Sequence, residues 1–285
     1  LFASEAAAIC GMSRYTQPLD IYNRKLNPGD IEKPNEAMQR GHRFESTVLD
    51  WYEEQVGGRL FSSPMLIHPE HEFLSATPDA LWVEKDPGKL PFSYQMDFTP
   101  IEAKTSQSKE EWGFEGSDDI PQEYIMQAQQ QMAVTDTKSC DVPVLFSNFN
   151  FKLYTVERND DLIQLIIESA GEMIERIRDR KPPEPNWQHP KTYELIRQVY
   201  GVSEGNVSLT EEASRLWLEA ESLTKQAGEL NKKAKENKAK ILHEMGENGI
   251  GHLADGRHLI RKKVKREARQ VRASEYVTLR CKKEL

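Results

Sequence analysis

Four charged side chains stand at spacings that could bring them into one site: Glu45, Asp79, Glu102 and Lys104. Side chains two residues apart on a strand point to the same face, so Glu102 and Lys104 would project together while Ala103 points away. Asp79 precedes them by enough residues for its strand to turn and to return alongside theirs. Glu45 lies in a preceding segment with helical spacing. We therefore expect three carboxylates and one amine to converge.

This set of groups suits the hydrolysis of a phosphodiester. Hard carboxylate oxygens bind Mg²⁺, which bridges protein carboxylates to substrate phosphates. A bound metal lowers the pKa of its water, a second metal can stabilise the leaving oxygen, and a lysine can position the water or neutralise developing charge. We expect Asp79 and Glu102 to hold the principal ion, with the Ala103 carbonyl as a further ligand and Glu45 completing the site. Two Mg²⁺ ions are expected, and Mn²⁺ could substitute.

The segments that must position these residues alternate between helical and strand-like patterns. Apolar residues at helical spacing predict a helix over Glu36 to Val56. Three β-rich stretches follow, with a turn at Pro87-Gly88 before the last (Arg59 to Ile67, Phe73 to Val83 and Tyr94 to Lys104). A helix, a pair of strands and another helix complete the order (Gln122 to Thr135, Val142 to Val156 and Leu162 to Ile177). This order favours an α/β fold with a mixed central sheet flanked by helices.

Prolines mark the clearest break in the chain, at Lys181-Pro182-Pro183-Glu184-Pro185-Asn186. A proline lacks an amide donor and pushes the residue before it out of helical geometry. We therefore expect a main domain over 1–183, a linker over 184–208 and a C-terminal helical arm with a small basic β-rich tail over 209–285.

The C-terminal arm begins with a long polar helix predicted over Leu209 to Met245. Alanine or isoleucine at one heptad position and leucine at another indicate a narrow coiled-coil seam (Ala213, Ala220, Ala227, Ala234 and Ile241; Leu216, Leu223 and Leu230). Packing against the same chain or a neighbouring subunit is the favoured interpretation, ahead of a direct contact with nucleic acid. Turn signals at Gly251 and Asp255-Gly256 then predict a hairpin.

The net charge of −8 is unfavourable for a protein that binds nucleic acid, because affinity for phosphate depends largely on Lys and Arg. The basic residues are nevertheless concentrated: residues 257–283 hold eleven Lys or Arg against two acidic residues. Such asymmetry indicates a basic element beside an acidic body. We expect a DNA-contacting tail, with a merely solvated surface as the alternative, that includes Arg261, Lys262, Lys263, Lys265 and Arg266.

Neither a membrane segment nor a secretory signal is predicted. The sequence lacks an apolar run near 18 residues, and residues 1–10 lack a basic start and a cleavage site. We expect a cytoplasmic setting, in the host if a phage encodes the chain. The three cysteines, Cys10, Cys140 and Cys281, are too widely spaced to indicate a disulfide framework or a cysteine-rich metal site.

Pro78-Asp79 followed by Glu102-Ala103-Lys104 resembles the signature of the PD-(D/E)XK nucleases, which have a restriction-endonuclease-like core. The neighbouring sequence is similar to phage-type exonucleases, exemplified by lambda exonuclease and the YqaJ-like viral recombinases. Three further segments resemble that group's first acidic helix, second motif and glutamine-rich helix: Gly41 to Glu45, Ser75 to Ala80, and Tyr124 to Gln129. The resemblance covers roughly residues 3–183. Each motif alone is a weak signal, whereas four in the right order are a strong one.

The resemblance implies a Mg²⁺-dependent exonuclease that digests double-stranded DNA from 5′ to 3′. The product would be a 3′ overhang for a single-strand annealing protein (RecT-like or Red-beta-like) in phage-type homologous recombination. It also implies a homo-oligomer, such as a ring-shaped trimer around DNA. Ser4 and Arg14 match positions of the pocket for the 5′-terminal phosphate, and a further arginine would precede Leu1. Gln129 matches a polar residue beside the metal site, and Gln127 is a further candidate for contact with DNA.

Several alternatives stay open at this point. An endonuclease or junction resolvase on the same fold would carry the same motif, and a catalytically silent DNA-binding or scaffold module would act through the helical arm. The intact acid set argues against the silent module, which needs no carboxylates around a lysine. Ser4 could simply cap a helix. Trp82 is more simply explained as core, while Trp112 could belong to the core or stack on a base.

Overall fold

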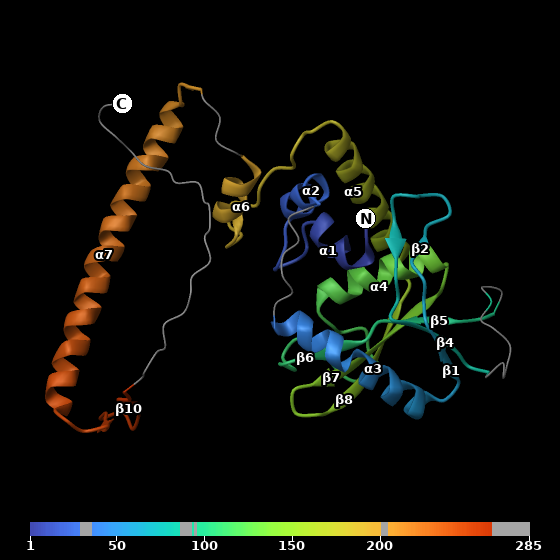
Figure 1. Cartoon of the computed structure of the whole chain (residues 1–285), viewed down its shortest axis with the longest axis horizontal. Helices are drawn as coiled ribbons and strands as arrows, with labels where there is room; N and C mark the ends of the chain where they lie inside the picture. Colours follow the sequence, from blue (N-terminus) through green and yellow to red (C-terminus); the bar gives the residue numbers. More distant parts are fainter. Residues whose placement is uncertain (29–35, 86–92, 94–95, 201–204, 264–285) are drawn as a thin grey trace. The chain divides into compact units, whose positions relative to one another are not determined.

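The computed structural model describes residues 1–28, 36–85, 93, 96–200 and 205–263. Its contacts divide the chain into two compact units, Leu1–Tyr200 and Gly201–Leu285 (Figure 1). No helix within the described residues is both long and apolar enough to span a membrane.

A mixed six-stranded sheet forms the centre of the first unit. Its strands pair in the order β1-β4-β5-β7-β6, and β8 pairs with the other edge of β7. The pairs β5–β7 and β6–β7 are parallel, whereas β1–β4, β4–β5 and β7–β8 are antiparallel. The strands span Arg59–Phe61 (β1), Ala80–Val83 (β4), Thr99–Ile101 (β5), Lys104–Ser106 (β6), Ser139–Phe146 (β7) and Phe151–Glu157 (β8). The predicted mixed central sheet is thus confirmed.

A second, two-stranded sheet joins Leu66–Ile67 (β2) to Ser75–Ala76 (β3). The β-rich stretches read from the sequence therefore each hold strands, but these are shorter than the patterns suggested and are separated by loops. The return of β5 alongside β4 is as expected, with Ala80 paired to Ile101. The turn proposed at Pro87-Gly88 lies outside the described residues.

Helices cover both faces of the central sheet. Tyr52 of α3 (Glu36–Val56) donates from its hydroxyl to Asp141 on β7 at 2.7 Å, whereas the next side chain along the strand, Cys140, meets Gln131 of α4 (Gln122–Thr135). Because neighbouring side chains on a strand point to opposite faces, α3 and α4 lie on opposite sides of β7. Figure 1 shows α4 between the sheet and a layer of other helices.

That outer layer contains short N-terminal helices and α5. It comprises the 3₁₀ turn η1 (Ala3–Glu5), α1 (Ala6–Ile9), α2 (Pro18–Leu26) and α5 (Asp160–Arg178). α5 begins two residues before the helix predicted from Leu162, because the Asn159 side chain accepts from the backbone amides of Asp161 and Leu162 and so caps the helix. Ser4 lies inside η1 while Phe2 is its N-cap residue, so the capping alternative for Ser4 is wrong.

Helix α4 reaches three different neighbours through consecutive glutamines. Gln129 contacts the end of β8, Gln130 donates at 3.0 Å to the Ser75 carbonyl on β3, and Gln131 contacts Glu102 between β5 and β6. All three side chains are buried. Hydrogen bonds as well as apolar contacts therefore fix the rotation of α4 about its axis.

The boundary predicted at residue 183 needs correction, because the compact unit extends to Tyr200. Gln17 donates to Thr192 Oγ1 and accepts from the Asn186 amide, both at 2.8 Å. Leu195 of α6 (Thr192–Val199) is buried in the same cluster as α1, α2 and α5. Residues 184–200 thus pack on the first unit, and the prolines end α5 without ending the domain.

The second unit contains the predicted long helix, α7 (Glu211–Met245), begun by Thr210, whose hydroxyl accepts from the Ala213 amide. Within the described chain α7 buries none of its side chains, and the seam leucines are exposed. A hairpin of β9 (Ile250–His252) and β10 (His258–Ile260) follows, as the turn signals predicted. Of the proposed basic tail, Lys265 and Arg266 lie outside the described residues.

Candidate active site

The parallel ladder along β7 is interrupted where the predicted catalytic residues lie. β5 and β6 pair with β7 in one register, Ile101 with Asp141 and Lys104 with Val144, and Glu102 and Ala103 fall between them. The Ala103 amide donates to Asp79 Oδ2 at 2.7 Å instead of to a strand. This bond fixes the first carboxylate against the backbone beside the second.

Glu102 is buried and is surrounded by hydrogen-bond donors. Oε1 accepts from the Lys104 ammonium and, at 2.6 Å, from Gln127 Nε2, while Oε2 accepts from Gln131 Nε2. The Glu102 amide donates to the Asp141 carbonyl at 2.9 Å. Both oxygens of this buried carboxylate are therefore hydrogen-bonded.

Lys104 lies between Glu102 and the first turns of α4. Its Nζ donates to Gln127 Oε1 at 3.2 Å and lies 4.9 Å from the centre of the Tyr124 ring. Burial acts to lower the pKa of Lys104, but the carboxylates of Glu102 and Asp79 outweigh it, so the pKa is raised. The ammonium is therefore a permanent positive charge at this site.

Asp79 is the carboxyl group of this set that is hardest to ionise. Burial, followed by the charge of Glu102, raises the pKa of Asp79 to about 8; Lys104 opposes the shift and Glu45 adds to it. The positive charge of Lys104 therefore does not fully compensate the negative charge of an ionised Asp79. We call Asp79, Glu102 and Lys104, with Glu45 at its margin, the carboxylate–lysine cluster.

Glu45 reaches the cluster from α3 and is the most open of its carboxylates, with 37% of its side chain exposed. Oε2 lies 3.3 Å from Nδ1 of His42, one helical turn earlier. The charge of Glu45 contributes to raising the pKa of Asp79. The structure thus brings Asp79, Glu102 and Lys104 together through hydrogen bonds, whereas Glu45 acts on them through its charge.

Three side chains of α4 face the cluster: Tyr124, Gln127 and Gln131. Gln127 was expected only as a DNA contact, and Gln131 was missed. The spacing of these residues, three and then four apart along one helix face, is the signal that could have found them. Cys140 Sγ donates to Gln131 Oε1 at 3.4 Å, which leaves the amide nitrogen of Gln131 to donate to Glu102.

Gln129 does not belong to the site, which corrects the role expected for it. Its amide nitrogen donates to the Glu157 carbonyl, and its oxygen accepts from the Asn159 amide, both at 2.8 Å. Gln129 therefore joins the end of β8 to the start of α5. Gln129 is two positions from both Gln127 and Gln131, and two positions along a helix turn a side chain by about 200°, to the opposite side of the helix.

The expected terminal-phosphate residues are less closely assembled. Arg14 forms ion pairs with Glu111 and with Glu123 on the first turn of α4, next to Tyr124. Ser4 is exposed on η1, and no hydrogen bond joins it to the cluster among the described residues.

Other residues expected to contact DNA lie elsewhere. Arg261, Lys262 and Lys263 are exposed in the second unit. Trp112 is buried against Tyr124, Phe146 and Tyr154, so the core interpretation holds for it.

Across the described ranges, no three His, Cys, Asp or Glu side chains already stand together as a complete set of metal ligands. Two carboxylates of the cluster nonetheless have the chemistry of Mg²⁺ ligands, and the raised pKa of Asp79 marks a place where a cation would relieve repulsion. Asp79 and Glu102 are therefore the residues that fit a metal ion.

Residues 1–138 match the YqaJ-like viral recombinase domain. This part of the chain, slightly under half of its length, is therefore similar to that domain. The match includes every residue of the carboxylate–lysine cluster and the three α4 residues that face it. No curated protein sequence matches the chain.

Solved structures show the same fold. The alkaline exonuclease LHK-Exo from Laribacter hongkongensis is 21% identical to this YqaJ-like chain, with a TM-score of 0.50 over 64% of this chain and 89% of that one. LHK-Exo in complex with dAMP is 23% identical, with the same TM-score and coverage. The first unit thus has a nuclease fold, as the motifs predicted.

Proposed function

We propose that this chain is a metal-dependent exonuclease that digests double-stranded DNA from 5′ to 3′ and leaves a 3′ overhang. The carboxylate–lysine cluster carries the proposal, because it places two carboxylates and a permanent cation side by side on a nuclease fold. The YqaJ-like viral recombinase domain supports a task in phage-type recombination.

Asp79 and Glu102 would hold Mg²⁺ or Mn²⁺, with the Ala103 carbonyl as a further ligand and Glu45 available for a second ion. When bound, the metal would make its water a nucleophile near neutral pH. Gln127 and Gln131 each donate to one oxygen of Glu102 and so fix the orientation of this carboxylate. Lys104 would place positive charge beside the phosphate that is cut.

The direction of digestion rests on Arg14 and Ser4. Arg14 is tied to Glu123, the neighbour of Tyr124, whose ring lies under the Lys104 ammonium. The Arg14 guanidinium, held beside the first turn of α4, could bind a terminal phosphate once it leaves Glu111 and Glu123. Binding of the 5′ phosphate there would place the adjacent phosphodiester at the cluster.

Further partners belong to the same proposal. The exposed leucine seam of α7 suits pairing with another copy, in keeping with a homo-oligomer such as a ring-shaped trimer. The basic residues after Arg257 would contact duplex phosphates, and a single-strand annealing protein would receive the overhang.

The test is a degradation time course on three substrates: linear duplex with a 5′ phosphate, linear duplex with a 5′ hydroxyl, and a covalently closed circle. We expect Mg²⁺-dependent loss of both linear substrates, faster with the phosphate, and an intact circle. Cutting of the circle would favour the endonuclease or resolvase alternative. Persistence of every substrate in Mg²⁺ and in Mn²⁺ would favour the silent DNA-binding module.

Variants connect the activity to the cluster. Lys104→Ala and Glu102→Gln should each reduce digestion by at least about a hundredfold, the scale on which losing one stabilising group slows such reactions. Glu168→Gln, at an exposed position of α5, is the matched control and should digest DNA at the wild-type rate. Equal rates for Lys104→Ala and wild type would show that the cluster is not the active site.

A further inference from the structure

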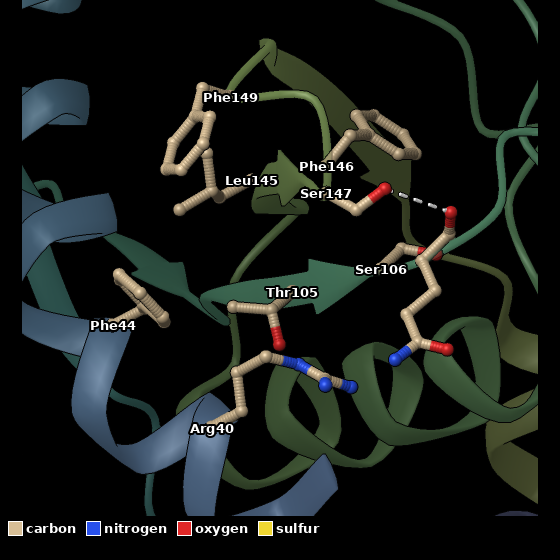
Figure 2. Close-up of a pocket in the computed structure, with 9 residues that line it drawn as sticks. Arg40, Phe44, Thr105, Ser106, Leu145, Phe146, Ser147 and Phe149 are labelled. Carbon is tan, nitrogen blue, oxygen red and sulfur yellow. Dashed lines mark hydrogen bonds between the residues drawn. The ribbon is translucent and has the colours of Figure 1, made fainter. Parts of the chain in front are cut away.

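A hollow with aromatic walls lies between α3 and the β6–β7 end of the sheet, on the face of β6 opposite to Lys104. Its volume is about 190 Å³, which is room for one planar ring system. Figure 2 shows the Phe149 ring beside Leu145, the Phe44 ring on the α3 side, and the Arg40 guanidinium reaching beneath Thr105. We call it the Phe149 pocket.

Phe149 is an unusual residue for its position. It lies in the turn between β7 and β8 with 79% of its surface exposed and a φ of 58°, in the left-handed region that a phenylalanine rarely adopts. Its amide donates to the Phe146 carbonyl at 2.9 Å, which holds the turn in this form. Exposure of the ring and the backbone conformation both cost stability, a combination that is typical of residues kept for binding.

The polar groups of the pocket are few and are placed around the apolar walls. With its amide oxygen turned toward Arg40, Gln107 accepts from both terminal guanidinium nitrogens at 3.0 Å, and these two bonds restrain the position of the guanidinium. The Thr105 side chain supplies a hydroxyl, whereas the Ser106 hydroxyl donates to the Ser108 carbonyl at 2.8 Å. Aromatic rings and an arginine plane bind the faces of nucleobases, while hydroxyls and a guanidinium meet their polar edges.

The pocket and the cluster share two elements. Phe44 precedes Glu45 on α3, and Thr105 follows Lys104 on β6. Because successive strand side chains point to opposite faces, Thr105 enters the pocket while Lys104 enters the cluster. β6 is an edge strand of the sheet, so a DNA strand whose phosphate lies at the cluster would place a neighbouring base in the pocket by passing over this edge.

We propose that the Phe149 pocket binds one unpaired nucleobase of the DNA strand held at the carboxylate–lysine cluster. This inference rests on the proposed nuclease function. It adds that the Phe44 and Phe149 rings and the Arg40 guanidinium receive this base.

Substrate and protein are changed together to test it. Binding is measured by fluorescence anisotropy in EDTA, with a duplex closed at one end by a hairpin and carrying one abasic site at each of the three terminal positions in turn. Phe149→Asn removes the ring but suits the left-handed backbone. Phe114→Ala, at another highly exposed phenylalanine, is the matched control, and Phe149→Tyr should rescue binding.

For the wild-type protein, we expect an abasic site at one of the three positions to weaken DNA binding roughly tenfold relative to the intact duplex. Phe149→Asn should bind the duplex with this abasic site as tightly as it binds the intact duplex, because stacking on the aromatic side chain has already been lost. The melting temperature of Phe149→Asn should be no lower than that of the wild type. Two outcomes would contradict binding of a base in the Phe149 pocket even if the protein degrades DNA. In one, the losses of affinity caused by Phe149→Asn and by the abasic site add at every position; in the other, Phe149→Asn binds the intact duplex as tightly as the wild type does. A wild-type chain that neither binds nor degrades DNA would overturn the proposed function and the pocket with it.

Discussion

The backbone amide of Ala103 donates to the Asp79 carboxylate at 2.7 Å and so links two strands where their ladder is broken. This hydrogen bond holds the Asp79 carboxylate beside Glu102, although the two negative charges repel each other. Electrostatic repulsion is therefore built into the backbone arrangement, and a bound cation or a proton relieves it.

Asp79→Asn should stabilise the metal-free protein at neutral pH. Because the pKa of Asp79 is raised from 3.8 to about 8 in the folded chain, the folded state holds a proton that the unfolded state releases, and stability falls as pH rises from about 4 to 8. Asparagine keeps an oxygen for the Ala103 amide and carries no charge. We expect thermal denaturation in EDTA to show similar melting temperatures near pH 4, and an advantage of several degrees for the variant near pH 8. A lower melting temperature for the variant at pH 8 would contradict the repulsion.

Gln131→Met and Gln129→Met should separate catalysis from stability. Gln131 donates to Glu102, so its loss should lower kcat roughly tenfold by leaving the carboxylate less well oriented. Gln129 ties β8 to α5, so its loss should lower the melting temperature and leave the kcat of the folded enzyme near wild type. Digestion rates and thermal denaturation are measured on both variants. A large loss of kcat in Gln129→Met alone would restore the role first expected for that residue.

Replacing Arg261, Lys262 and Lys263 together by glutamine should reduce the salt dependence of DNA binding. Removing one ionic interaction with a phosphate lowers the slope of log K against log salt by about 0.9. These side chains are exposed, but Arg261 also donates to the Gly246 carbonyl at the end of α7, so thermal denaturation is measured alongside to check that the variant is folded. Binding to the same duplex is measured across a salt series, and a matched triple variant of exposed α5 residues (Gln164, Glu168 and Glu172 to alanine) is the control. An unchanged slope would leave the basic segment as a solvated surface.

Leu216→Gln combined with Leu223→Gln should lower the molar mass of the protein in solution. Both leucines are more than half exposed on α7, and polar residues at a seam position weaken helix pairing. Leu218→Gln, similarly exposed but off the seam, should keep the wild-type mass. Sedimentation velocity provides the comparison, and a wild-type chain that sediments as a monomer would count against pairing through α7.

Much of the fold followed from local patterns. α3 and α4 begin and end at the predicted residues, and the period of two along a strand placed Glu102 and Lys104 on one face. The hairpin return that brings Asp79 alongside was also predictable, because β4 and β5 are close in sequence. These features depend on residues a few positions apart or on one turn.

The errors have a different physical origin. α4 is buried on most of its circumference, so apolar periodicity could not show which of its glutamines faces the cluster. The domain boundary was misplaced because the hydrogen bonds of Gln17 to Thr192 and Asn186 join segments far apart in sequence. Proline reports the end of a helix, whereas packing of the following residues depends on partners that no local rule contains.

The three consecutive glutamines of α4 restrict how this helix can change over evolutionary time. Gln129, Gln130 and Gln131 each serve a different neighbour, so one inserted or deleted residue upstream of them would rotate the helix and exchange all three partners at once. A point substitution at one glutamine alters one contact, which a second substitution in its partner segment can restore. An insertion or deletion alters all three contacts at once. We expect length variation among related chains to fall in the loops on either side of α4 and to spare its interior.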